Sequence, residues 1–199
     1  MKKFVILLLS ISLILCSCSH VENVTIKADP EKIITKTVIK EITPPLKFAR
    51  GKYEDKRADF SYLAKWSEGM NTWTLYEETP IEDVIFDGLR TLFMHSGLAW
   101  VNKDSSEIII NVTLLGVVAI RTPKIFSEEI ISSIQIKLDF VSSASGKQIY
   151  SNIYNGTNED YGFIIMSDVE KSINESLINC INSIGLDKGL KENLSNIKI

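Results

Sequence analysis

A helical spacing of apolar residues is clearest between residues 79 and 97. Apolar side chains recur there every three or four positions, at Ile81, Val84, Ile85, Leu89, Leu92 and Phe93. Thr79 is placed to cap the first turn, Pro80 suits the first helical position, and Glu82 completes a capping box. Gly97 supplies a stop signal. The pattern predicts an amphipathic helix of about four to five turns.

A second helix is predicted near the C-terminus. Residues 167–170 read Ser-Asp-Val-Glu, which is another capping box. An apolar stripe follows at helical spacing, at Val169, Ile173, Leu177, Ile181 and Ile184, and Gly185 ends it. Residues 187–199 are polar, and we expect them to form a loose tail.

Between the two helices the pattern changes to that of strands. Residues 107–117 form a nearly continuous apolar run, which suits a central strand. Residues 130–141 alternate, with Ile134, Ile136, Leu138 and Phe140 on one side and polar side chains on the other. Turn-forming residues at 142–147 lead to a third strand over 148–155. One face of the sheet is therefore predicted to be buried and the other open.

The order of these elements is typical of an α+β fold. Residues 46–50 add a short alternating strand, and residues 51–78 have the composition of a long loop rich in aromatic residues. We predict, for residues 45–186, an antiparallel or mixed sheet of about four strands with two helices packed on one face. A signal peptide and an extended arm precede this domain.

The N-terminus indicates export and lipid attachment. Two lysines precede an apolar run over residues 4–15, which is the arrangement of a signal peptide and shorter than a membrane span. The motif Leu15-Cys16-Ser17-Cys18 resembles the lipobox of bacterial lipoproteins, whose cysteine is acylated and becomes the new N-terminus. A small serine precedes Cys18 and a bulky leucine precedes Cys16, so we predict signal peptide 1–17 and lipid on Cys18. The alternative is an ordinary signal peptide, but no A-x-A-like site is present.

The residues after Cys18 are predicted to hold the domain at a membrane. Ser19 follows the cysteine, and by resemblance to lipoprotein sorting rules the lack of aspartate there favours the outer membrane, facing the periplasm. Residues 18–44 are interpreted as a tether, in which the β-branched stretch 33–42 forms a strand or an extended arm. Loss of residues 1–17 lowers the net charge from −3 to −5, which argues against a nucleic-acid partner.

Candidate catalytic chemistry is sparse. His95 lies at the predicted end of the first helix, where interaction with the helix dipole explains it. Cys180 lies beside the apolar stripe of the last helix and is interpreted as a small buried hydrophobe rather than a reactive thiol. The acid pairs at 77–78, 128–129 and 159–160 fall in or near loops and are interpreted as solvated charges. We expect no metal, no cofactor and no enzymatic activity.

Two segments are candidates for a contact surface. Trp66 and Trp73 in the aromatic-rich stretch could stack on a sugar or lipid or anchor a partner protein. The alternative is that they cover an end of the core. The hairpin tip at 117–126 is apolar, flanked by Arg121 and Lys124, and could touch a membrane or a partner or fold onto its own domain.

A family resemblance rests on several short segments in order. Gly51-Lys-Tyr-Glu-Asp55-Lys-Arg57 follows a short strand, the capped helix ends in Ser96-Gly97-Leu98, and Ile134-Gln-Ile-Lys-Leu138 precedes Gly146-Lys-Gln-Ile-Tyr150. This order resembles the YajG-type family of uncharacterised bacterial lipoproteins and is broadly similar to auxiliary lipoproteins of envelope transport systems. Asp55 and Arg57 match the D-x-R of that family, which implies a structural ion pair at the strand end, with a binding role as an alternative. The family implies no enzymatic activity.

These observations predict a lipid-anchored binding or scaffolding module for an envelope assembly or transport system, with an envelope protein as partner. The candidate surface comprises Asp55, Arg57, Trp66 and Trp73. A carrier of a small lipid or glycan is the alternative, and a hydrolase ranks last because no nucleophile and base are paired in the sequence.

Overall fold

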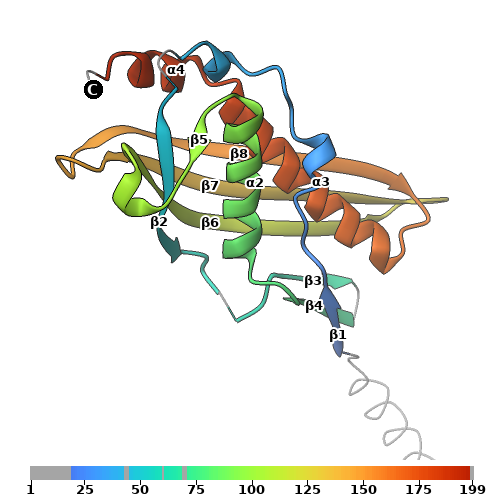
Figure 1. Ribbon diagram of the computed structural model, residues 1–199. Coiled ribbons are helices and arrows are strands. Elements are labelled where there is room, and N and C mark those ends of the chain that lie inside the picture. The colour runs from blue at the N-terminus through green and yellow to red at the C-terminus, as the bar shows by residue number, and fades with distance from the viewer. Residues whose placement is uncertain (1–18, 43–44, 60, 69–70, 198–199) are drawn as a thin grey trace, which may run out of the picture.

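The computed structural model describes residues 19–42, 45–59, 61–68 and 71–197, and it confirms the α+β class. A five-stranded sheet has the order β5-β2-β6-β7-β8, and a separate three-stranded sheet has the order β1-β4-β3 (Figure 1). The prediction of about four strands and two helices was too low, because the described residues form three α-helices and two sheets.

The five-stranded sheet is mixed. Its strands are β2 (Lys47–Asp55), β5 (Ala99–Trp100), β6 (Ile108–Pro123), β7 (Glu128–Ser142) and β8 (Gln148–Gly162). β2 runs parallel to both of its neighbours, and β6, β7 and β8 form an antiparallel meander. The predicted alternation of β7 is confirmed, since Ile134, Ile136, Leu138 and Phe140 are all buried. The meander strands extend well beyond their predicted ends, so that the β6–β7 hairpin projects from the body of the molecule (Figure 1).

Two helices, α2 (Ile81–His95) and α3 (Met166–Gly185), pack on one face of this sheet, as predicted (Figure 1). Phe93 of α2 stacks on Phe48 of β2 with ring centroids 4.6 Å apart, and both rings are fully buried. α3 approaches β7 and β8 through small residues. The hydroxyl of Ser132 is hydrogen-bonded to those of Ser172 and Ser176 of α3, at 2.7 and 2.6 Å. Gly156 lies so close to α3 that a Cβ on it would be 1.9 Å from the carbonyl oxygen of Ser176.

The predicted caps of the two helices are not the ones that form. α2 begins at Ile81, whose backbone N–H is bound by the carboxylate of Glu77 rather than by a Thr79 cap. α3 begins at Met166, before the predicted cap Ser167. Its first turn is closed by Asp168, which accepts a hydrogen bond from the N–H of Ile165 at 2.9 Å. The stop signal at Gly97 is confirmed by its positive φ of 76°.

The polar tail is folded rather than loose. Residues Lys188–Ser195 form α4, which buries Leu190 and Leu194. Asp187 caps α4 by accepting from the N–H of Leu190 at 3.1 Å. It also accepts hydrogen bonds from the hydroxyls of Tyr150 and Tyr154 at 2.8 and 2.7 Å. Burial alone would raise the pKa of Asp187, but these hydrogen bonds outweigh it and hold that pKa below its usual range.

The segment between Ser19 and Ile42 is not an extended arm. It contains β1 (Ser19–Val24) and two short 3-10 helices, Pro30–Lys32 and Val38–Glu41. Five of its apolar side chains are buried in the common core, at Val24, Ile26, Ile33, Ile39 and Ile42. Burial of this many aliphatic side chains outweighs the freedom that a tether would retain.

Two asparagines of α3 bind the backbone of this N-terminal segment. Asn174 accepts from the N–H of Lys27 at 2.8 Å and donates to the carbonyl of Thr25 at 3.3 Å. Asn182, two helical turns later, accepts from the N–H of Ile34 at 2.9 Å and donates to the carbonyl of Lys32 at 3.1 Å. The side-chain amides thus satisfy backbone groups much as a neighbouring strand would. We call this contact the asparagine clasp.

The stretch 51–78, interpreted above as a loop, also contains strands. β3 (Ala64–Glu68) and β4 (Asn71–Glu77) pair antiparallel, with Trp66 opposite Trp73. β1 then pairs parallel to β4, with His20 opposite Trp73. Aromatic pairs across neighbouring strands stabilise a sheet. Such pairs depend on which strands are neighbours, so they leave no periodic pattern along the sequence from which these strands could be predicted.

Candidate binding surfaces

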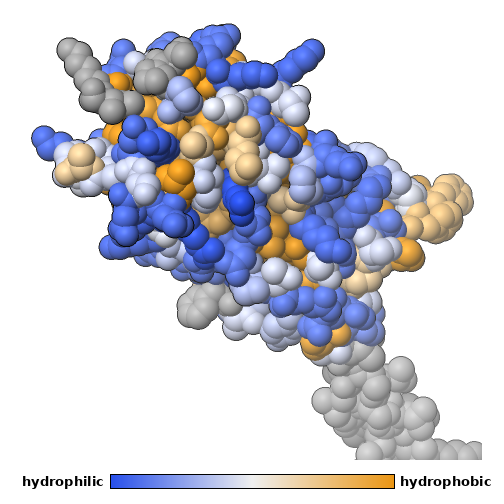
Figure 2. Space-filling view, viewed as in Figure 1, coloured by the Kyte–Doolittle hydropathy of each residue, from blue (hydrophilic) through white to orange (hydrophobic). Residues whose placement is uncertain are grey.

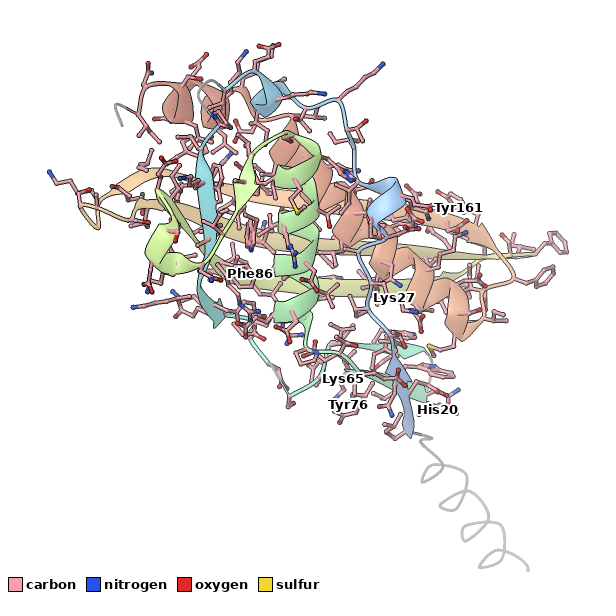
Figure 3. All side chains as sticks on the ribbon, viewed as in Figure 1. His20, Lys27, Lys65, Tyr76, Phe86 and Tyr161 are labelled. Carbon is pink, nitrogen blue, oxygen red and sulfur yellow. The ribbon has the colours of Figure 1, made fainter. Side chains whose placement is uncertain are left out.

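The three-stranded sheet carries a stack of aromatic rings, one from each strand. The rings of His20 and Trp73 are 4.2 Å apart at an interplanar angle of 15°, and those of Trp73 and Trp66 are 5.9 Å apart at 8°. Figure 3 shows His20 at the outer end of β1. The pairing of the strands places each ring beside the next, so the stack follows directly from the register.

This stack is mostly interior. Trp66 is 8% exposed and points toward Ala119, Ile130 and Val169, where the small sheet meets the large one. Trp73 is half-buried and packs against the core. Within the described residues, neither indole N–H has a hydrogen-bond partner. The geometry favours the alternative given above, in which the two tryptophans cover an end of the core rather than form an exposed surface.

Asp55 and Arg57 form an ion pair where β2 ends. The guanidinium reaches the carboxylate at 2.6 Å, and its Nη1 donates to the carbonyls of Tyr62 and Leu63 at 3.0 and 3.2 Å. Burial alone would raise the pKa of Asp55, but the hydrogen bonds from Arg57 outweigh it and lower that pKa. The Arg57 side chain is 7% exposed, so the pair ties the chain leaving β2 to the segment entering β3.

Next to this pair lie two polar groups with unsatisfied atoms. Tyr53 and Glu77 each have a buried side-chain oxygen that lacks a hydrogen-bond partner among the described residues. Burial raises the pKa of Glu77, and the opposing effects of the Ile81 N–H and of Arg57 are smaller. Burial also raises the pKa of Tyr53. The four side chains form a polar cluster between the two sheets.

The face of the large sheet opposite the helices is open. In the part of the chain that the structure describes, no helix covers it, and most of its side chains are exposed or half-exposed. Polar pairs occupy its centre, including Gln135 with Asn155 at 2.6 Å and Lys137 with Asp139 at 2.9 Å. Ile153 is 48% exposed beside them. The prediction of one buried and one open face is confirmed.

The hairpin tip is exposed rather than folded back. Ile125 and Phe126, at the turn between β6 and β7, are each 88% exposed. The loop between β8 and α3 reaches the same place with Phe163 and Ile165, and both loops line one open groove of about 530 Å³. In Figure 2 these apolar side chains form a projection at the right of the molecule. The sequence singled out the first loop but not the second, because two apolar residues before a helix are an ordinary pattern.

The remaining candidates have structural explanations. Cys180 is fully buried, its thiol donates to the Tyr154 carbonyl at 3.5 Å, and burial raises its pKa to about 12. His95 ends α2. Among the described residues no three His, Cys, Asp or Glu side chains gather as a metal would require. None of the described helices is long and apolar enough to cross a bilayer. Cys18, the predicted lipid attachment, lies outside the described residues.

No family model matches the chain, and no curated protein sequence matches it. The fold is similar to that of protein XCC0632 from Xanthomonas campestris, of the DUF330 family, with 10% identity over 84% of this chain and 92% of that one and a TM-score of 0.57. CT253 from Chlamydia trachomatis has 9% identity over 75% of this chain and 98% of that one, with a TM-score of 0.46. A minor lipoprotein from Acinetobacter baumannii has 8% identity over 75% and 90%, with a TM-score of 0.38.

At these identities the likeness concerns the fold alone. The match to XCC0632 supports a shared architecture over most of both chains, and the other two are too distant to carry an argument. The resemblance to the YajG-type family stays a prediction.

Proposed function

We propose that the protein is a lipid-anchored, non-catalytic binding or scaffolding module of the bacterial cell envelope. In this proposal Cys18 carries the lipid, and the domain faces the periplasm from the outer membrane. The lipobox supports the anchor, and the position of β1 sharpens it. Because β1 begins at Ser19, directly after Cys18, the folded domain would sit against the bilayer instead of hanging from a long tether.

The open face of the five-stranded sheet carries the binding part of the proposal. Hydrogen-bonded strands hold it rigid, and the helices and the small sheet all pack on the other side. Exposed aliphatic residues such as Ile153 lie among the polar pairs on this face. A rigid surface that carries both apolar and polar side chains suits a protein partner, since protein–protein interfaces combine an apolar centre with polar contacts.

The anchor is tested by the mass of the protein purified from bacterial membranes. The wild-type chain is expected to begin at Cys18 and to carry the added mass of acyl chains. Cys18→Ser is expected to lose the acyl mass and to keep the signal peptide. Cys16→Ser is the matched control and is expected to be processed and acylated like the wild type. Acylation that survives in the Cys18→Ser variant contradicts the assignment.

The binding face is tested by a photo-activatable side chain placed at single positions in living cells. At Ile153, on the open face, we expect cross-linking to one defined envelope protein. At Met94, which is 54% exposed on α2, we expect none. A second substitution, Gln135→Lys, is expected to remove the cross-link by placing a cation at the contact. Equal labelling from both positions contradicts the proposal.

A further inference from the structure

Four large apolar side chains stand almost free of the protein at one end of the long hairpin. Ile125, Phe126 and Phe163 are 88%, 88% and 89% exposed, and Ile165 is 63% exposed. They come from two loops that are nearly forty positions apart in the chain. We call this group the apolar tip. An exposed apolar cluster drawn from two loops indicates a contact surface more strongly than single exposed residues do.

The two loops are fixed to each other by a charged group behind the tip. The carboxylate of Glu128 accepts hydrogen bonds from Arg121 at 2.5 Å, across the hairpin, and from the backbone N–H of Ile164 at 3.1 Å, in the other loop. Lys124 is paired with Glu129 at 2.9 Å. Arg121 and Lys124 are therefore each paired with a carboxylate behind the tip, and the apolar side chains project beyond these pairs.

The position of the chain start indicates what covers the tip. The first described residue, Ser19, follows Cys18 directly, so a bilayer that holds the lipid lies within a few residues of β1. Figure 1 shows the start of β1 at the lower edge of the molecule and the end of the hairpin at its right edge. A bilayer surface that runs obliquely along the lower right of this view would meet both. Tyr161 is 60% exposed and lies at the end of β8 that leads into the loop of Phe163 (Figure 3). Tyrosine is a common side chain at membrane interfaces.

We infer that the apolar tip inserts into the lipid layer that holds the anchor on Cys18. The inference rests on the proposed lipid anchor and adds a second point of membrane contact. A single lipid allows the domain to rotate freely, and a second contact restricts that rotation. The open sheet face would then point within a narrower range of directions from the bilayer.

The test uses a polarity-sensitive fluorophore on single cysteines in the mature, full-length protein. Cys180 is fully buried with its pKa raised to about 12, so it stays unlabelled at neutral pH, and an acylated Cys18 is blocked. Phe126→Cys and Phe163→Cys report on the two loops. Met94→Cys on α2 is the control, because its side chain is exposed but belongs to neither loop. The vesicles contain phosphatidylethanolamine with phosphatidylglycerol as the minor component.

In vesicles, the emission of the labels at 126 and 163 is expected to shift to shorter wavelengths. The same labels should become about tenfold less accessible to an aqueous quencher, because they move from water into an apolar phase. The label at 94 is expected to stay fully quenchable. Unchanged quenching at 126 and 163 overturns the inference. So does a shift without vesicles that coincides with a dimer in sedimentation, because a second copy of the chain then covers the tip.

The anchor and the tip fail separately in this design. Acylation is read from the mass of the same labelled protein. An acylated protein with a water-exposed label retains the proposed anchor and contradicts only the insertion of the tip. A chain without acyl mass contradicts the anchor. Its N-terminal cysteines are then free to react, so the label is placed in a variant that also carries Cys16→Ser and Cys18→Ser, where it reports whether the tip binds lipid by itself.

Discussion

The five-stranded sheet is built around a core of phenylalanines and aliphatic residues, whereas the three-stranded sheet is built around a stack of two tryptophans and a histidine. Phe48, Phe93 and Phe140 leave no polar atom to satisfy, and all three are fully buried. In the small sheet the two indole N–H groups lack partners among the described residues, and Glu77 nearby is held with a raised pKa. We therefore expect the large sheet to contribute more to the stability of the fold than the small sheet does.

The two sheets also differ in how far apart their strands lie in the sequence. β6, β7 and β8 follow one another through short turns. The small sheet joins β1 to β4 across about fifty residues, and it depends on the asparagine clasp to keep the N-terminal segment in place. We expect substitutions in the large sheet to unfold the whole molecule and substitutions in the small sheet to act locally.

The largest effect is expected from Phe93→Ala. This ring stacks on Phe48 and meets the edge of Phe140, so its loss leaves a cavity at the centre of the core. We expect a loss of about 3–5 kcal/mol in the free energy of unfolding, measured by urea denaturation. Met94→Ala, one position further along the same helix but exposed, is the control and should change stability by less than about 0.5 kcal/mol.

Trp66→Ala is expected to cost about 3 kcal/mol, because the indole fills the space between the two sheets. Hydrogen exchange should show where the loss falls. Faster exchange is expected in residues 64–77 and 19–24, with the protection of β6, β7 and β8 retained. Trp73→Ala should show the same distribution with a smaller effect, since that ring is half-buried. Uniformly faster exchange in both sheets would contradict the independence of the small sheet.

Arg57→Ala is expected to cost about 2 kcal/mol, since it removes a charged hydrogen-bond donor from Asp55 and from two backbone carbonyls. Because the pKa of Asp55 is lowered in the folded state, the stabilisation is present at neutral pH and is lost as the pH falls through that lowered pKa. The difference between variant and wild type in thermal unfolding should therefore shrink in acid. Lys56→Ala, which breaks the exposed pair with Glu54, should have almost no effect.

The smallest effect, with the opposite sign, is expected from Glu77→Gln. Burial raises the pKa of this carboxyl, so its contribution to stability is greatest below the ordinary pKa and is lost as the pH rises through the raised value. Glutamine keeps an acceptor for the Ile81 N–H without the charge. The variant should melt slightly above the wild type at neutral pH, and the gap should close as the pH falls to about 4. A gap that widens in acid would contradict the assigned direction.

The sequence predicted those parts of the fold whose signal is local. The spacing of Ile81 to Phe93 and the alternation of Ile134 to Phe140 were sufficient for α2 and β7. α4 had a signal as well, since Asp187 can cap a helix and Leu190 and Leu194 are four apart, but one apolar pair in a polar segment did not outweigh its composition.

The small sheet and the N-terminal segment lacked such a signal. Their buried residues, such as Val24, Ile33 and Ile39, are irregularly spaced, and their partners are remote. Asn174 and Asn182 lie on the polar side of α3, where a side chain bound to backbone and a solvated one look alike in sequence. Among the candidate surfaces, the hairpin tip was visible from the apolar run at 117–126, whereas its second half required the structure to bring Phe163 beside it.

The asparagine clasp also limits the order in which parts of the chain can fold. Ile34 and Asn182 are 148 positions apart in the sequence. The N–H of Thr25 donates to the carboxylate of Glu170, which is 145 positions away. A chain that emerges N-terminus first displays this segment long before its partners exist, and such long-range contacts form late. The N-terminal segment is thus the last part of the fold to be fixed in place, and it stays mobile until α3 has emerged.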